Sequence, residues 1–203
     1  MTPKTKGLID IARLTFKFAL VDRVTMLEDG EMYESDTDHT VMLAVCACAL
    51  VESLYKDKLD IGKVAQFAIV HDLVEAYAGD TNSINITDEN REAKEIREAE
   101  SLKRIEGELG GVYPWVHKTI EEYERLDTKE AQFIKTLDKV MPKISHALNK
   151  GIALKKLGVS KEETESHFLV QTKEYKEKYG KDFPELIDIL EEVMDITVKE
   201  AYV

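Results

Sequence analysis

The sequence predicts an all-α fold, a single bundle of seven or eight helices. Apolar residues recur at helical spacing, β-branched residues rarely alternate with polar ones, and the 203 residues include only 10 glycines and 4 prolines. Apolar residues make up 43% of the chain, enough for one substantial core. No linker separates two parts, so we expect residues 1–203 to form one domain.

Capping and stop signals place the individual helices. The pairs Ser35/Asp38, Asp127/Glu130 and Ser160/Glu163 have the spacing of capping boxes, and other helices end at glycine or begin at proline. Residues 22–34 form an irregular stretch, and residues 80–86 a polar loop. The charged segment 88–108 intersperses acidic and basic residues, which predicts a solvated helix face. The expected helices are 4–21, 36–55, 61–78, 87–110, 114–125, 128–149, 160–179 and 184 to the end.

Composition excludes some partners and locations. The formal net charge is −12, and such an acidic surface repels the backbone of double-stranded nucleic acid. The sequence shows no signal peptide and no run of the roughly 20 apolar residues that a membrane span needs. Cys46 and Cys48 would point apart on a helix, so we expect buried free thiols in a reducing cytoplasm.

The segment from His71 to Asp80 carries the strongest chemical signal. His71, Asp72 and Glu75 follow a strongly apolar run, and a buried helix does not hold three ionisable groups in five residues without partners. A divalent cation would accept the imidazole and neutralise the carboxylate. His39, in the first turn of its helix, and Asp138, which interrupts an apolar stripe, are candidates for completing the coordination sphere. Two imidazoles and two carboxylates suit Mn, Fe, Co, Ni or Zn better than Mg or Ca.

This order of residues resembles the HD-domain metal-dependent phosphohydrolases, and within them the small 5′-deoxynucleotidase group. The resemblance rests on Arg23, on Glu34-Ser35 before His39, on His71-Asp72-x-x-Glu75-x-x-x-Gly79-Asp80, and on Asp138 in Leu137-Asp138-Lys139. It covers about residues 10–150, and we expect the helices of residues 160–203 to pack on that metal-binding core.

The resemblance implies a role for each matching residue. His39, His71, Asp72 and Asp138 would bind the metal, and Arg23 would bind phosphate. Glu75 would handle protons at the attacking water or the leaving oxygen, and Asp80 would hold the sugar or help to organise the attack. Val24 departs from the pattern, because relatives that select deoxyribose tend to carry a large aromatic residue after the arginine.

The leading functional hypothesis is hydrolysis of a (deoxy)nucleoside 5′-monophosphate by metal-activated water. The alternatives are a dNTP triphosphohydrolase on the same scaffold and a non-catalytic, metal-containing binding module. Lys139 and Lys143 are further candidates for phosphate binding, whereas His117, His146 and His167 lack acidic companions. An apolar stripe in the last helix would serve either to form a homodimer or to pack on the chain's own core. Its members are Phe183, Leu186, Ile187, Leu190, Val193 and Met194.

Overall fold

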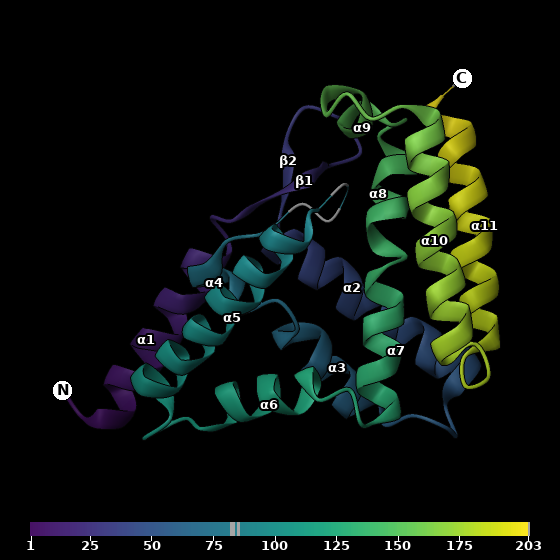
Figure 1. Cartoon of the computed structure of the whole chain (residues 1–203). Coiled ribbons are helices and arrows are strands. Elements are labelled where there is room, and N and C mark those ends of the chain that lie inside the picture. Colours follow the sequence, from purple (N-terminus) through teal and green to yellow (C-terminus); the bar gives the residue numbers. More distant parts are fainter. Residues whose placement is uncertain (82–83, 85, 203) are drawn as a thin grey trace.

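The computed structural model describes residues 1–81, 84 and 86–202, and it confirms the all-α prediction (Figure 1). The described helices are α1 (Pro3–Phe18), α2 (Asp36–Leu50), the π-helical turn η1 (Val51–Tyr55), α3 (Ile61–Val70), α4 (Glu75–Ala78), α5 (Asp88–Leu109), α6 (Trp115–Glu124), α7 (Lys129–Asp138), α8 (Met141–Leu148), α9 (Ile152–Lys156), α10 (Lys161–Tyr179) and α11 (Pro184–Ala201).

The helices divide into two groups that meet at α3. In Figure 1, α1, α4, α5 and α6 lie to the left, and α7, α8, α10 and α11 lie to the right. The main core contains Leu43 of α2 and Phe133 of α7, together with Leu186 of α11. The second core contains Leu14 of α1 and Ile105 of α5. Helix α3 contributes to both, because Phe67 packs in the main core and Val70 in the second.

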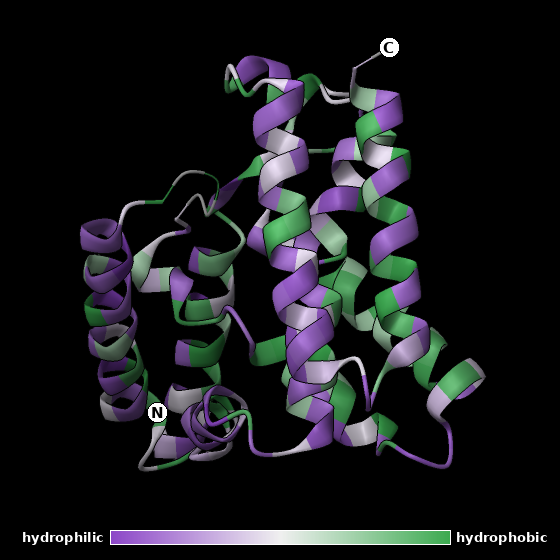
Figure 2. Ribbon diagram, turned by 45° about the vertical axis from the view of Figure 1, so that its right-hand side comes forward, coloured by the Kyte–Doolittle hydropathy of each residue, from purple (hydrophilic) through white to green (hydrophobic). Residues whose placement is uncertain are grey.

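Several local predictions are confirmed. The Ser35/Asp38 and Ser160/Glu163 capping boxes both form with reciprocal hydrogen bonds. Helix α5 buries little more than Ser101, Ile105 and Leu109, and hydrophilic residues dominate its ribbon, at the left of Figure 2. The charged segment is therefore a solvated helix face.

The irregular stretch 22–34 is in part a β-hairpin, which the sequence did not predict. Strand β1 (Asp22–Met26) pairs antiparallel with β2 (Tyr33–Ser35), and the register is irregular between its ends. The hairpin has little alternation of apolar residues, and it is held by tertiary contacts instead. Asn149, at the end of α8, donates a 3.0 Å hydrogen bond from Nδ2 to the carbonyl oxygen of Met26.

Two helices that were expected to be continuous are broken. The expected helix 61–78 divides into α3 and α4, and the expected helix 128–149 divides into α7 and α8. Pro142 explains the second break, because it lacks an N–H and its ring clashes with the carbonyl group four residues earlier. The cap of α7 is Thr128, which accepts a hydrogen bond from Ala131 N, and not the predicted Asp127/Glu130 box.

The structure also shows the burial of the C-terminal apolar stripe and of the two cysteines. Phe183, Leu186, Ile187 and Leu190 are buried in the chain's own main core, which supports internal packing of this stripe. Cys46 and Cys48 are free thiols, but both are half-exposed rather than buried, because α2 shows one side to solvent.

Candidate metal centre

The four predicted ligands converge from three separate segments. His39 lies in the first turn of α2, His71 and Asp72 lie in the turn between α3 and α4, and Asp138 is the last residue of α7. One ligand atom from each of the four residues falls within 4.8 Å of the others. The structure therefore brings together residues that are up to 99 positions apart in the sequence.

The break between α3 and α4 serves this convergence. After Val70 the backbone makes short turns, with Leu73 N bonded to the carbonyl of Val70 and Glu75 N to that of Asp72. Because residues 71–74 form turns, their side chains are not confined to the spacing of one regular helix face. Instead the side chains of the adjacent His71 and Asp72 both reach the same cluster, and their atoms Nε2 and Oδ2 are 3.0 Å apart.

His71 has the arrangement of a metal ligand. Its Nδ1 lies 2.8 Å from the carbonyl oxygen of Ala68 and so carries the proton, which leaves a lone pair on Nε2. That Nε2 is buried and has no hydrogen-bond partner among the residues that the structure describes. A buried polar atom without a partner is costly, and a cation at the cluster would satisfy it.

His39 is oriented in a similar way by a carboxylate. Its Nδ1 donates to Glu34 Oε1 at 3.1 Å, while its Nε2 lies 3.0 Å from Asp138 Oδ1. Glu34 is itself buried and accepts a 2.8 Å hydrogen bond from Ser145. Without a metal, burial opposes the charged imidazole, but the hydrogen bonds to Asp138 and Glu34 outweigh it and raise the pKa of His39 to about 9. The donor set and its supporting hydrogen bonds fit a divalent transition metal.

Arg23 projects from β1 into a group of carboxylates. Its guanidinium donates to Asp36 Oδ1 and Asp72 Oδ2, both at 3.1 Å. It also lies 3.9 Å from Glu75 and 4.0 Å from Glu34. Arg23 is therefore fixed by its neighbours beside the metal ligands, on a strand rather than on the irregular stretch that the sequence indicated.

Glu75 is almost completely buried at the start of α4. Burial, together with the negative charges of Asp72 and Asp80, raises the pKa of its carboxyl group to about 10. Lys94 opposes this shift, with its Nζ 3.3 Å from Glu75 Oε1. In the metal-free chain this shift favours the protonated form of Glu75, which is the form that a general acid requires. The half-buried Asp80 is close enough for its charge to contribute.

Sequence reasoning missed three residues of this centre. Glu34 was noted only as part of a motif, and Asp36 only as the start of a helix. Lys94 is one of many charges on α5, where no spacing distinguishes it from its solvated neighbours. Their roles depend on contacts between elements, which helical periodicity does not report.

The lysines and histidines that were weaker candidates differ in whether they reach the centre. Lys139 reaches the centre, with Nζ 2.5 Å from Asp138 Oδ2. Lys143 is instead buried, where it donates to the Lys139 carbonyl and to Gln171. His146 is buried as well.

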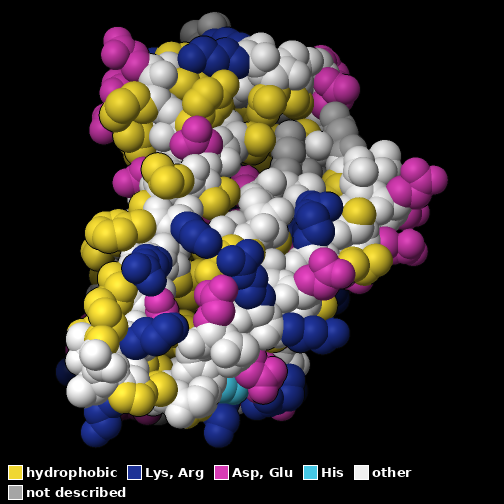
Figure 3. Space-filling view, turned by 90° about the vertical axis from the view of Figure 1, so that its left-hand side faces the viewer, with side chains coloured by type: hydrophobic (Ala, Val, Ile, Leu, Met, Phe, Trp, Pro, Cys, Tyr) yellow, Lys and Arg dark blue, Asp and Glu magenta, His cyan; other side chains and the backbone are white. Residues whose placement is uncertain are grey.

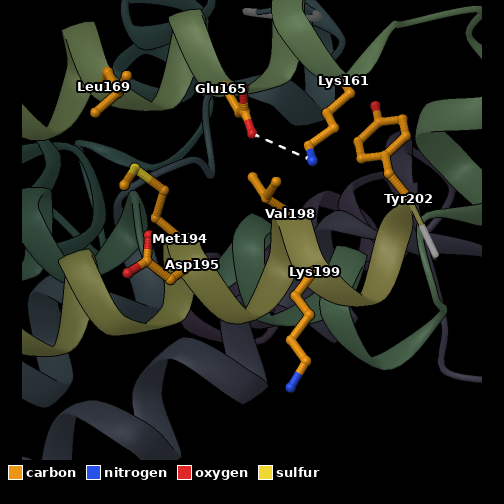
Figure 4. A pocket seen from close by; sticks show the side chains of 8 residues that line it. All are labelled: Lys161, Glu165, Leu169, Met194, Asp195, Val198, Lys199 and Tyr202. Carbon is orange, nitrogen blue, oxygen red and sulfur yellow. Dashed lines mark ion pairs between the residues drawn. The ribbon is translucent and has the colours of Figure 1, made fainter.

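A groove of about 540 Å³ lies elsewhere, between α10 and α11 (Figure 4). Leu169, Met194 and Val198 form its apolar lining, and Lys161 pairs with Glu165 at 3.8 Å along one side. None of the four ligands is among its lining residues. The groove is thus separate from the metal centre.

Comparison with known proteins shows the family to which the chain belongs. The family model of the HD domain matches residues 17–181. The chain is 32% identical over 135 residues to 5′-deoxynucleotidase HDDC2 of Mus musculus and 30% identical over 136 residues to that of Homo sapiens. The matched parts cover 65% and 66% of this chain. They span 64% and 63% of those relatives, slightly less than two thirds of their length.

Two solved structures have similar folds. One, described as a predicted metal-dependent phosphohydrolase from Magnetospirillum magnetotacticum, superposes with a TM-score of 0.74 at 24% identity and covers 98% of each chain. The other, a conserved hypothetical protein from Pyrococcus furiosus, gives a TM-score of 0.62 at 25% identity and covers 91% of this chain and 99% of its own.

Helical fold, ligand set and family match together define the class of protein: this chain belongs to the HD-domain family.

Proposed function

We propose that this protein hydrolyses (deoxy)nucleoside 5′-monophosphates to a nucleoside and inorganic phosphate. The observation that carries the proposal is the position of a buried Glu75 and of Arg23 beside the four convergent side chains that could hold a metal ion. Similarity of 30–32% to proteins named 5′-deoxynucleotidase supports the choice of substrate.

The metal-binding residues would be His39, His71, Asp72 and Asp138, holding Mn, Co, Fe, Ni or Zn. Such an ion supplies a Lewis acid that lowers the pKa of water and neutralises charge on phosphoryl oxygens. Glu34 keeps His39 oriented, and the Ala68 carbonyl keeps His71 oriented. These contacts hold both imidazoles with Nε2 available for coordination.

The remaining residues would handle phosphate, protons and sugar. The planar guanidinium of Arg23 can take two phosphoryl oxygens at once. The water oxygen would form a bond to phosphorus as the bond to the 5′ oxygen breaks, and Glu75 would give its proton to that leaving oxygen. The proton lost by the attacking water would stay on the phosphate product, and Glu75 would regain a proton from solvent. Asp80 would bind a sugar hydroxyl or help to organise the attack. No covalent intermediate is required.

The test is phosphate release from a panel of nucleotides with Mn²⁺ or Co²⁺ added. We expect inorganic phosphate from nucleoside 5′-monophosphates, with a ribose and a deoxyribose member of each base in the panel. Release of triphosphate from a dNTP would favour the triphosphohydrolase alternative. A protein that binds metal stoichiometrically but turns over no nucleotide would favour the non-catalytic module.

A further inference from the structure

The surface is hollowed where α5 passes into α6, at a distance from the metal centre. The hollow measures about 550 Å³, and its lining includes Lys103, Glu106, Gly107, Gly111, His117 and Lys118. We call it the α5–α6 site. Lys94, which contacts Glu75, precedes the first of these residues by nine positions on α5, roughly 14 Å along the helix axis. None of the four metal-binding residues lines the hollow.

The lining contains a buried histidine whose ring lacks a partner. His117, in the first turn of α6, is only 6% exposed. Its Nδ1 is buried and has no hydrogen-bond partner among the residues that the structure describes. A Cβ on Gly110 would lie 3.2 Å from Cε1 of this ring. Because Cε1 lies between the two ring nitrogens, the edge that carries them faces the glycine side of the hollow. A buried polar atom without a partner is costly, so this ring indicates a ligand.

The start of helix α6 adds hydrogen-bond donors at the same place. The first N–H groups of a helix have no acceptor within the helix. Here the cap residue, Pro114, makes no side-chain hydrogen bond to them, and the first turn holds no acidic residue. The dipole of this ten-residue helix also favours negative charge at its N-terminus. These features point to an anion.

The side chains at the rim are predominantly basic. Lys103 and Lys118 are exposed, and neither forms an ion pair within the described chain. Glu106 is the one acid among the described residues of the lining. The local charge is therefore opposite in sign to the net charge of −12. A Cβ on Gly107 or Gly111 would meet no atom of the described chain within 4 Å beyond its chain neighbours and its own helix backbone. A ligand can thus approach the backbone there.

The α5–α6 site opens on the face that Figure 3 shows. Figure 1 places the connection between α5 and α6 at its lower left, and Figure 3 views the molecule from that side. Basic side chains, together with histidine, come to the surface at the lower end of this face. A solute can therefore reach the site directly from solvent.

We propose that the α5–α6 site binds the phosphate group of a small molecule. The phosphate oxygens accept hydrogen bonds from Nδ1 of His117 and from N–H groups at the start of α6, and Lys103 and Lys118 balance the charge. The volume of the hollow is in the range of small-molecule sites. A divalent cation is the poorer occupant, because only His117 and Glu106 in the lining have metal-binding side chains and the two lysines repel it.

The first experiment uses the single tryptophan of the chain as a native reporter. Trp115 is the first residue of α6 and is 47% exposed. With a chelator present to keep the metal centre empty, inorganic phosphate should change its fluorescence in a saturable way. Sodium chloride at the same ionic strength controls for charge screening. No response to phosphate, or an equal response to chloride, would overturn the proposal. No turnover is measured, so the result does not depend on the proposed function.

Variants of the lining test each contact in the same titration. His117→Phe keeps a ring but removes both nitrogens, and it should weaken phosphate binding by about tenfold or more. Lys103→Gln and Lys118→Gln should each weaken binding about two- to fivefold, and Glu106→Gln should strengthen it by a similar factor. The matched control is Lys173→Gln, an exposed lysine of α10 outside the site, which should leave the affinity unchanged. Equal affinity in the wild type and His117→Phe would overturn the assignment.

Thermal unfolding separates phosphate binding from packing. Without phosphate, His117→Phe should have a Tm no lower than that of the wild type, because it removes a buried polar atom that has no partner. At a phosphate concentration ten times its Kd, the Tm of the wild type should rise by about 3–6 °C, and that of His117→Phe much less. A variant that is clearly less stable without phosphate would show that the nitrogen is satisfied within the chain, against the proposal.

A last titration identifies the source of the phosphate group. Inorganic phosphate and a nucleoside 5′-monophosphate are compared through Trp115, again with a chelator. Tighter binding of the nucleotide, weakened in His117→Phe, would assign the site to a nucleotide, and equal binding of the two would assign it to free phosphate. A response to both that His117→Phe leaves unchanged would contradict the proposal.

Discussion

At the scale of single residues, the carboxyl group of Glu75 is buried and lies 3.3 Å from the amine of Lys94. We expect Glu75→Gln to keep its metal and fold but to lower kcat by about 10²-fold or more, because the amide cannot deliver a proton. Glu98 provides a matched control, since it lies at the same 3.3 Å from Lys94 without contacting the centre. Elemental analysis and steady-state kinetics measure both effects. Loss of metal from Glu75→Gln would make Glu75 a ligand.

The same carboxyl group also makes stability depend on pH. Its pKa is raised from 4.5 to about 10 by burial, so the folded metal-free protein holds a proton that the unfolded chain releases. The free energy of unfolding therefore falls as pH rises from about 4.5 towards 10. Glu75→Gln removes this loss, so in the presence of a chelator its Tm should exceed that of the wild type by an amount that grows from pH 5 to 9. Parallel Tm profiles would contradict the assignment.

Arg23 has two tasks that substitution can separate. Arg23→Lys should reduce kcat/KM for a nucleoside monophosphate, and Arg23→Ala should reduce it further, by about 10²-fold, as expected for a lost charge-stabilising donor. Arg23→Ala also leaves the buried Asp36 without its cation, so its Tm should fall. Asp36→Asn with Arg23 intact is the control. Unchanged kcat/KM in Arg23→Ala would place the phosphate elsewhere.

At the scale of elements, Gly151 lies where the start of α9 meets α11, whereas Gly158 follows α9 in open space. Gly151 has φ +68°, and a Cβ there would lie 2.4 Å from the Cβ of Ala201 in α11. Gly158 has φ +70°, and a Cβ there would meet no atom of the described chain within 4 Å apart from its two chain neighbours. Gly158→Ala should cost only the left-handed conformation, about 1 kcal/mol, and Gly151→Ala more than that, because α11 must also shift. Denaturant unfolding measures both, and equal losses would contradict the contact.

At the scale of the whole molecule, the metal centre joins α2, the α3–α4 turn and α7. A metal that binds only the folded chain adds about 2.7 kcal/mol at a concentration 100 times its Kd, a rise of about 5–10 °C in Tm. We expect this rise with Mn²⁺ or Co²⁺ for the wild type and for His167→Ala, but not for His71→Ala or Asp72→Ala. A metal-dependent rise that persists in the double variant His71→Ala/Asp72→Ala would refute the ligand assignment.

The sequence alone determined the helical class and most helix starts, and it singled out the four residues that we propose as metal ligands. Helical spacing and capping residues act locally, so Ser35 and Ser160 could be recognised without a fold. His71-Asp72 could be recognised because ionisable residues after an apolar run require a partner. These inferences depend on interaction energies that residues close together in the sequence determine.

Tertiary structure alone decided what lies around those ligands. The turn after Val70 departs from helical geometry, and the hairpin that carries Arg23 is tied to Asn149, so neither follows from local spacing. Glu34 and Lys94 became part of the centre only when distant segments met, at His39 and at Glu75. Helix α2 has no charged residue from His39 to Val51, but only the packing of the chain shows that Val41 and Val45 are exposed to solvent. The reason is physical: burial and the strength of charge interactions depend on neighbours that are far away along the chain.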